Sequence, residues 1–105
     1  VMTADGKNIR LLAEDRLPAD FPTKKLVTPK QIVITAPDGV KVYCQLFETG
    51  ENNGKKPAIV YVHGGPQRQM LLGWNYSEYY SNVYAMNQYL AARGYVVLSV
   101  NFRLG

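Results

Sequence analysis

The chain has 105 residues, enough for one small domain or part of a larger one. Hydrophobic residues make up 47% of it and charged residues 19%, so we expect a folded core and not a disordered chain. The formal net charge of +4 is mild, and the lysines stand in separated pairs and singles, which favours a solvated surface over a nucleic-acid partner. No apolar run approaches the ~18 residues that a membrane span needs.

A single cysteine and a single histidine cannot build a metal site of the Cys/His type. We therefore expect no metal and no cofactor. Cys44 has no second cysteine with which to form an intrachain disulfide. The cysteine count therefore does not indicate a cellular compartment.

The first 29 residues carry turn and breaker signals but little periodicity. Asp5-Gly6 is a strong turn dipeptide, and residues 9–12 can form a returning strand, so residues 1–12 are interpreted as the remnant of a hairpin. Residues 13–29 contain three prolines and no helical or strand period. This stretch is typical of a connector and is the best candidate for a domain boundary.

Residues 31–47 are predicted to form an antiparallel hairpin. The Ala-Pro-Asp-Gly sequence at 36–39 supplies the turn, because proline presets one φ and glycine accepts a positive one. The return strand alternates with period two, which places Cys44 on an apolar face and Tyr43 and Gln45 on a wetter one. Such a strand suits a position near a sheet edge, with Cys44 as a small buried hydrophobe.

Two later runs, 58–62 and 95–98, are apolar at every position. Continuous apolar runs of this length are typical of parallel strands that helices cover on both faces. A parallel pair alone would expose large apolar faces, so we expect the chain to be a fragment, truncated at both ends.

A helix is predicted between these runs. Four large side chains recur at steps of four, three and four and should form its buried stripe. Ser77 or Ser81 can cap its start, and Gly94 suits the position just past its end. The four stripe residues are Tyr79, Val83, Met86 and Leu90.

The turn that follows the first apolar run carries the chemical signal. Its sequence is His63-Gly64-Gly65-Pro66, and the paired glycines allow backbone N–H groups to face the space above the sheet edge. Such groups can donate to an oxyanion formed during acyl transfer. The alternative is a plain strand-to-helix turn. A dinucleotide site is excluded because G-x-G-x-x-G is absent and Pro66 lacks an N–H.

The segment from Tyr61 to Pro66, followed by an aromatic stretch, a helix, and Gly94-Tyr95-Val96-Val97 leading to Asn101-Phe102-Arg103, resembles the prolyl oligopeptidase family of serine peptidases. The nearest branches are those similar to dipeptidyl peptidase IV and to acylaminoacyl peptidase. The resemblance covers about residues 27–105. It implies a serine-type peptidase that hydrolyses short peptides, with His63, Gly64 and Gly65 in the oxyanion region. His63 stands where several members carry a tyrosine whose hydroxyl helps to bind the oxyanion.

The same resemblance implies an α/β fold, namely a partial α/β-hydrolase fold in which an antiparallel hairpin precedes a β-α-β unit. Residues 1–20 would be the end of a preceding β domain, a remnant of a propeller blade, together with the connector. Residues 21–105 would be the N-terminal part of the hydrolase domain. The implied partners are a peptide substrate and the remainder of the polypeptide, and the family allows a homodimer of the parent.

Two further segments resemble family motifs, and the second is set aside as a decoy because it precedes the predicted helix whereas the nucleophile elbow comes later in the family's fold. Residues 101–105 resemble the family's Asn/Asp-x-Arg-Gly-Ser segment, from which Leu104 and Gly105 depart. For Arg103 we favour a structural ion pair or loop anchor over a direct contact with substrate. Gly73-Trp74-Asn75-Tyr76 resembles the nucleophile elbow with asparagine in place of serine. Trp74 and Tyr76 are therefore interpreted as packing residues or as a wall of the site.

No catalytic residue is expected in this chain. It has no G-x-S-x-G sequence, since Ser77, Ser81 and Ser99 lack the flanking glycines, and its one histidine is already in the turn. The triad is expected downstream of Gly105, and the chain alone should be inactive. Two alternatives stay open. One is a carboxylesterase or lipase of the same fold, against which Pro66 argues, and the other is a catalytically dead binding module.

Overall fold

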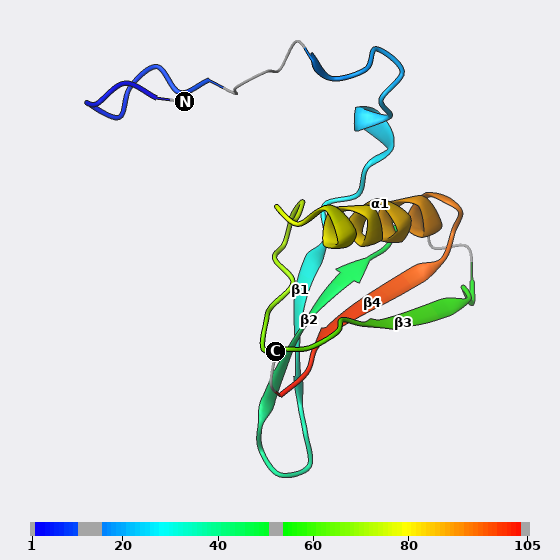
Figure 1. Ribbon diagram of the computed structural model, residues 1–105. Helices are drawn as coiled ribbons and strands as arrows, with labels where there is room; N and C mark the ends of the chain where they lie inside the picture. Colours follow the sequence, from blue (N-terminus) through cyan, green and yellow to red (C-terminus); the bar gives the residue numbers. More distant parts are fainter. Residues whose placement is uncertain (1, 11–15, 51–53, 104–105) are drawn as a thin grey trace.

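Four strands and one helix form the body of the molecule, in the computed structural model that describes residues 2–10, 16–50 and 54–103 (Figure 1). The sheet order is β1-β2-β4-β3, with α1 lying across one face. Antiparallel pairing joins β1 to β2 and β2 to β4, whereas β3 and β4 run parallel. The elements are β1 (Lys30–Thr35), β2 (Lys41–Phe47), β3 (Ala58–Val62), α1 (Glu78–Ala92) and β4 (Val96–Asn101).

The expected fold class, a partial α/β-hydrolase fold, is wrong. The described residues form a small, mixed and predominantly β structure with a single α-helix, where the expected class has several helices. The physical reason lies in the connections: only the segment between β3 and β4 has a helical period, and the other described connections are turns and extended chain.

The predicted hairpin and its turn are confirmed. Strands β1 and β2 pair in register from Lys30 opposite Leu46 to Thr35 opposite Lys41. Gly39 has a φ of 84°, and its N–H donates to the carbonyl of Ala36 at 2.8 Å, closing the turn that proline begins. Strand β2 lies between β1 and β4, next to the edge strand β1, which agrees with its expected place near a sheet edge.

The parallel pair and the helix between its strands are also confirmed. The first apolar run forms β3 and lies beside β4 in parallel register, from Ala58 opposite Val96 to Val62 opposite Val100. Ser77 occupies the N-cap position of α1, but its side chain makes no capping hydrogen bond, so the predicted side-chain cap is absent. Gly94, at a φ of 90°, ends the helix with its N–H on Ala91 O, while the N–H of Tyr95 reaches Leu90 O. These two bonds satisfy carbonyls that the helix end leaves open.

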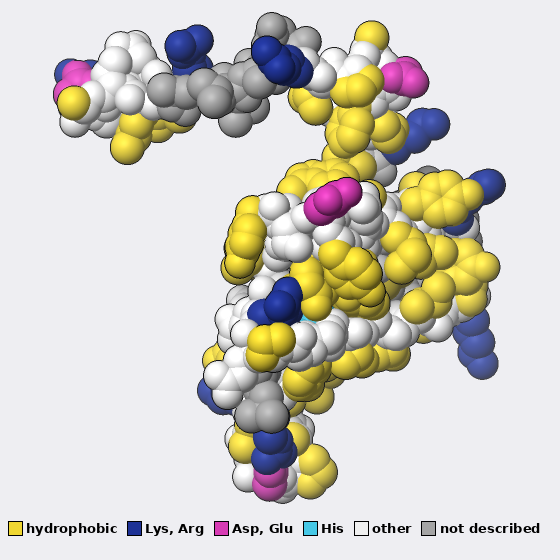
Figure 2. All heavy atoms as spheres, viewed as in Figure 1, with side chains coloured by type: hydrophobic (Ala, Val, Ile, Leu, Met, Phe, Trp, Pro, Cys, Tyr) yellow, Lys and Arg dark blue, Asp and Glu magenta, His cyan; other side chains and the backbone are white. Residues whose placement is uncertain are grey.

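The stripe expected to face the core is displaced by one position. Tyr79 is 67% exposed and Met86 is also exposed. The residues that α1 buries are Tyr80, Tyr84, Asn87, Gln88 and Ala91. Two of these are amides, so hydrophobicity alone does not mark the buried face of this helix. The exposed aromatic and apolar side chains gather over the outer side of α1 (Figure 2).

The core lies between α1 and the sheet. Phe47 and Val97 are fully buried there with Ala91, and the ring of Phe47 meets that of Tyr84 edge to face at 5.4 Å. No helix among the described residues covers the other face of the sheet, and Val60 on β3 is 64% exposed. The expectation that both apolar strands are covered on both faces is therefore wrong.

The N-terminal segment runs away from the sheet and then returns to it as a connector (Figure 1). The predicted turn is present, because Gly6 has a φ of 74° and its N–H donates to Thr3 O. Residues 2–10 contain no strand, so the returning strand expected from residue 9 onward is absent from residues 9–10, and residues 11–12 lie outside the described part. The connector contains a short 3₁₀ turn, η2 (Thr23–Lys25).

A buried amide ties this connector to the helix. Gln88 of α1 accepts from the N–H of Val27 through Oε1 and donates to its carbonyl through Nε2, both at 2.8 Å. The side chain thus occupies the place that a paired strand would take beside Val27. Its Nε2 also donates to the hydroxyl of Tyr84 at 3.1 Å.

Candidate functional site

The turn at residues 63–66 begins where β3 ends, beside the C-terminal end of its parallel neighbour β4. Neither Gly64 nor Gly65 has a positive φ, so the backbone does not require glycine at either place. A Cβ on Gly64 would lie 3.4 Å from the hydroxyl of Tyr80, and one on Gly65 would meet no atom within 4 Å. Because glycine has no side chain, the backbone at these two positions is left exposed.

The N–H groups of this backbone are unused within the part of the chain that is described. Both glycines are exposed, and no hydrogen bond in residues 2–10, 16–50 and 54–103 has the N–H of Gly64 or Gly65 as its donor. Two successive free donors at the end of a parallel strand are what an acyl oxyanion needs. Neither glycine lines either of two cavities that the described residues form beside this loop.

His63 lies beneath the turn and does not project from it. Its side chain is 3% exposed and stacks on Phe102, with the ring centroids 4.4 Å apart. Nδ1 lies 3.0 Å from the carbonyl of Gly64, which can only accept, so Nδ1 carries the proton. The other ring nitrogen, Nε2, is buried without a partner in the described structure. His63 is therefore suited to shaping the turn, and the amides of Gly64 and Gly65 are the better oxyanion donors.

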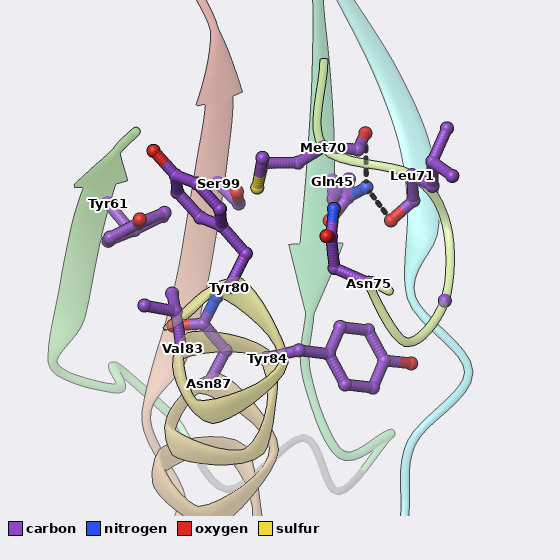
Figure 3. A pocket seen from close by; sticks show the side chains of 11 residues that line it. Gln45, Tyr61, Met70, Leu71, Asn75, Tyr80, Val83, Tyr84, Asn87 and Ser99 are labelled. Carbon is purple, nitrogen blue, oxygen red and sulfur yellow. Dashed lines mark hydrogen bonds between the residues drawn. The ribbon is translucent and has the colours of Figure 1, made fainter. Parts of the chain in front are cut away.

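Two buried amides hold the rest of this loop against the sheet. Gln45 of β2 donates to the carbonyls of Met70, at 2.7 Å, and of Leu71 (Figure 3). Asn101 of β4 accepts from the Met70 N–H at 2.8 Å and donates to the Met70 carbonyl at 3.2 Å. Gln45 is only 4% exposed, which corrects its expected place on a wetter face. The loop, and not solvent, satisfies its polar group.

We expect Asn101→Ala to lower the free energy of unfolding by about 1–3 kcal/mol, since it leaves the Met70 N–H inside the protein without an acceptor. Urea denaturation followed by circular dichroism measures the loss, and amide exchange at Met70 should quicken. The matched control is Asn82→Ala on the exposed side of α1, where a change within about 0.5 kcal/mol is expected. Equal effects of the two substitutions would contradict the role given to Asn101.

A cluster of rings and one cation lies between the loop and the start of α1. The guanidinium of Arg68 lies over the ring of Tyr80, 4.6 Å from its centroid. Tyr80 extends from α1 toward Tyr61 of β3 (Figure 3). Burial, and then the neighbouring Tyr79 and Tyr80, raise the pKa of the Tyr61 hydroxyl, while Arg68 partly offsets this. The hydroxyl of Tyr61 therefore keeps its proton at neutral pH.

A narrow cavity of about 10 Å³ lies under the loop, lined by Tyr61, Tyr80, Gln45 and Ser99 among others, and it has room for about one water molecule. Ser99 is fully buried there, and Ser81 donates its hydroxyl to Glu78 O at 2.9 Å. Ser77 occupies the N-cap position of α1 without a capping hydrogen bond from its side chain. No hydrogen bond in the described residues joins any of these serines to His63.

The other predicted residues are placed apart from the turn. Arg103 forms an ion pair with Asp38 of the hairpin turn at 2.6 Å, as the structural interpretation of this residue expects. Trp74 packs between Tyr84, at 4.7 Å, and Phe21 of the connector, at 6.2 Å. Tyr76 is 96% exposed. Of the expected site residues, only His63, Gly64 and Gly65 lie together.

Cys44 is buried on β2, as expected. Burial raises the pKa of its thiol, so the reactive thiolate is disfavoured at neutral pH. In the ranges that the structure describes, no three His, Cys, Asp or Glu side chains are grouped so that they could hold a metal ion. Within the same ranges no helix has the length and apolarity to cross a bilayer.

Sequence reasoning missed Gln45, Asn101 as a loop anchor, and Arg68. The only signal for the two amides is a polar residue in an otherwise apolar strand, which also fits an exposed position. Arg68 lies in a polar loop without any period. Comparison with known proteins adds nothing to these assignments: no family model matches the sequence, and a search of curated proteins finds no significant match.

Proposed function

We propose that this chain supplies the oxyanion-binding turn of a serine-type peptidase that hydrolyses short peptides, as dipeptidyl and aminoacyl peptidases do. One observation carries the proposal: the N–H groups of Gly64 and Gly65 are exposed at the end of β3 and donate to no acceptor in the described residues. The likeness of residues 61–66 to the prolyl oligopeptidase family supports it.

In this proposal the chain binds and polarises the carbonyl group of the substrate, and a nucleophile from another part of the enzyme attacks it. A serine outside these 105 residues adds to the carbonyl carbon of the scissile peptide bond, and the carbonyl oxygen becomes an oxyanion. The N–H groups of Gly64 and Gly65 donate to that oxygen and stabilise it. Collapse of the intermediate expels the amine and leaves an acyl-enzyme, which water then hydrolyses.

Gln45 and Asn101 act as positioning residues for this turn. They fix Met70 and Leu71, midway along the loop between β3 and α1, to the sheet. A fixed loop keeps the two donors in place before the oxyanion forms, which is the condition under which such donors are most effective.

The test uses the polypeptide that carries this segment in its cell of origin, captured with an antibody raised against the 105-residue chain. We expect a fluorophosphonate to label it at a serine outside these residues, and we expect it to cleave dipeptidyl and aminoacyl p-nitroanilides. The 105-residue chain alone should neither be labelled nor turn over these amides. Cleavage of p-nitrophenyl esters without amides would indicate an esterase. A captured protein that is neither labelled nor active would favour a binding module.

A further inference from the structure

A cation without an anionic partner in the described structure lies beside the candidate turn. Arg68 stacks over Tyr80, and its Nε is buried with no hydrogen-bond partner there. The ion pairs in the described residues are Lys30 with Glu48 and Arg103 with Asp38, so Arg68 takes part in neither. The ring fixes the guanidinium in place, and its charge stays uncompensated within the described structure.

Arg68 lines a cavity of about 400 Å³ on the loop between β3 and α1, which we name the loop pocket. Among the residues that the structure describes, no acidic side chain lines it. Asn75 accepts from the N–H of Ser77 through Oδ1, so its NH₂ group remains as a donor. The other lining residues are Gln67, Gln69, Met70, Leu71 and Tyr76.

The size and donors of the loop pocket define a ligand. Pockets of roughly 300–1,000 Å³ hold small molecules or short peptide segments. A planar guanidinium forms paired hydrogen bonds with a carboxylate, and neutral amides add donors without further charge. One cation balances a monoanion, whereas a phosphate dianion is better served by several cations.

We propose that the loop pocket binds the carboxylate of a short peptide through Arg68, with the side chains of Gln67 and Asn75 as additional donors. The pocket does not include His63, Gly64 or Gly65. The proposal therefore concerns binding alone, and its outcome is independent of whether the enzyme cleaves peptides. The loop anchors Gln45 and Asn101 hold the Met70 segment that forms one side of the pocket.

A peptide offers a carboxylate at its C-terminus or on an acidic side chain, and two pairs of probes separate these sources. The first pair is N-acetyl-trialanine with a free C-terminus and the same peptide as its C-terminal amide. The second pair is the amide of N-acetyl-Ala-Glu-Ala and its glutamine counterpart. Binding to the 105-residue chain is measured by calorimetry and by amide chemical shifts. We expect the carboxylate member of at least one pair to bind about tenfold more tightly than its neutral partner.

Substitution at Arg68 tests the assignment. We expect Arg68→Gln to weaken binding of that peptide about tenfold or more. Arg68→Lys keeps the charge but loses the planar guanidinium, so its affinity should lie between those of Arg68→Gln and the wild type. The matched control is Arg93→Gln, because Arg93 also lies over a tyrosine ring, that of Tyr89, but donates to its hydroxyl and is remote from the loop pocket. It should leave the affinity unchanged.

Chemical shifts of the unsubstituted chain provide a second measurement that does not depend on the folding of a variant. We expect them to move at residues 67–76. Shifts centred elsewhere, equal binding of charged and neutral peptides, or unaltered affinity in a folded Arg68→Gln variant would each overturn the proposal. Tighter binding of inorganic phosphate than of acetate would overturn the assignment of the ligand as a carboxylate.

Discussion

Replacing Phe47 by alanine is expected to lower the free energy of unfolding by about 3–5 kcal/mol. Phe47 is completely buried at the end of β2, and its ring lies 5.4 Å from that of Tyr84 in an edge-to-face contact. The substitution removes the ring from the cluster that joins α1 to the sheet and leaves a cavity beside Val97. Because small domains have only ~5–15 kcal/mol of stability, this loss should be visible as a large fall in the urea midpoint.

A conservative substitution at Phe47 and a control at an exposed aromatic residue accompany the measurement on Phe47→Ala. Phe47→Leu keeps most of the volume and should cost less than about 1.5 kcal/mol, so it remains measurable if the alanine variant does not fold. Tyr76→Ala removes an aromatic ring that is exposed and should change stability by no more than about 0.5 kcal/mol. A loss below about 1 kcal/mol for Phe47→Ala would show that the core has been assigned to the wrong residues.

Gly65→Ala should leave the fold intact and reduce peptidase turnover about a hundredfold. Gly65 has no positive φ, and a Cβ there would meet no atom within 4 Å, so neither strain nor a clash opposes alanine. In the proposed function, however, the methyl group stands where the substrate carbonyl must approach the backbone N–H. The measurements are the urea midpoint of the 105-residue chain and kcat/KM of the captured enzyme on a p-nitroanilide.

The matched control is Gly50→Ala. Gly50 also lacks a positive φ, and a Cβ there would likewise meet no atom within 4 Å, but this glycine lies in the loop after β2. The substitution should alter neither stability nor turnover. Full activity in the Gly65→Ala enzyme would remove the support for an oxyanion role. A loss of stability comparable with the loss of activity would instead assign Gly65 to folding.

Local signals in the sequence predicted the elements well. Proline and glycine at 36–39 fix the hairpin turn, and the apolar run at 58–62 coincides with β3. The position of Gly94 marks the end of α1, because only a residue tolerant of positive φ completes that hydrogen-bond pattern. These features depend on neighbours in the chain, so a single sequence suffices to find them.

Features that depend on distant partners were not predictable in this way. Gln45 is buried because the carbonyls of Met70 and Leu71 accept from it, and nothing beside Gln45 in the sequence indicates that partner. The buried side of α1 was misplaced because Asn87 and Gln88 belong to it. The fold class failed for the related reason that apolar strands were taken to imply helices on both faces.

The side-chain amide of Gln88 makes the two backbone hydrogen bonds that a neighbouring strand would make with Val27. The position of the connector just before β1 therefore depends on a residue of α1. The Gln88 amide binds both backbone groups of Val27, which lies 61 positions earlier. A shorter side chain at position 88 would therefore remove these two hydrogen bonds and leave the hydrogen bonds of the sheet in place. Gln88 therefore couples residue 27 of the connector to α1, in addition to the packing of Val27 against the core and of Phe21 against Trp74.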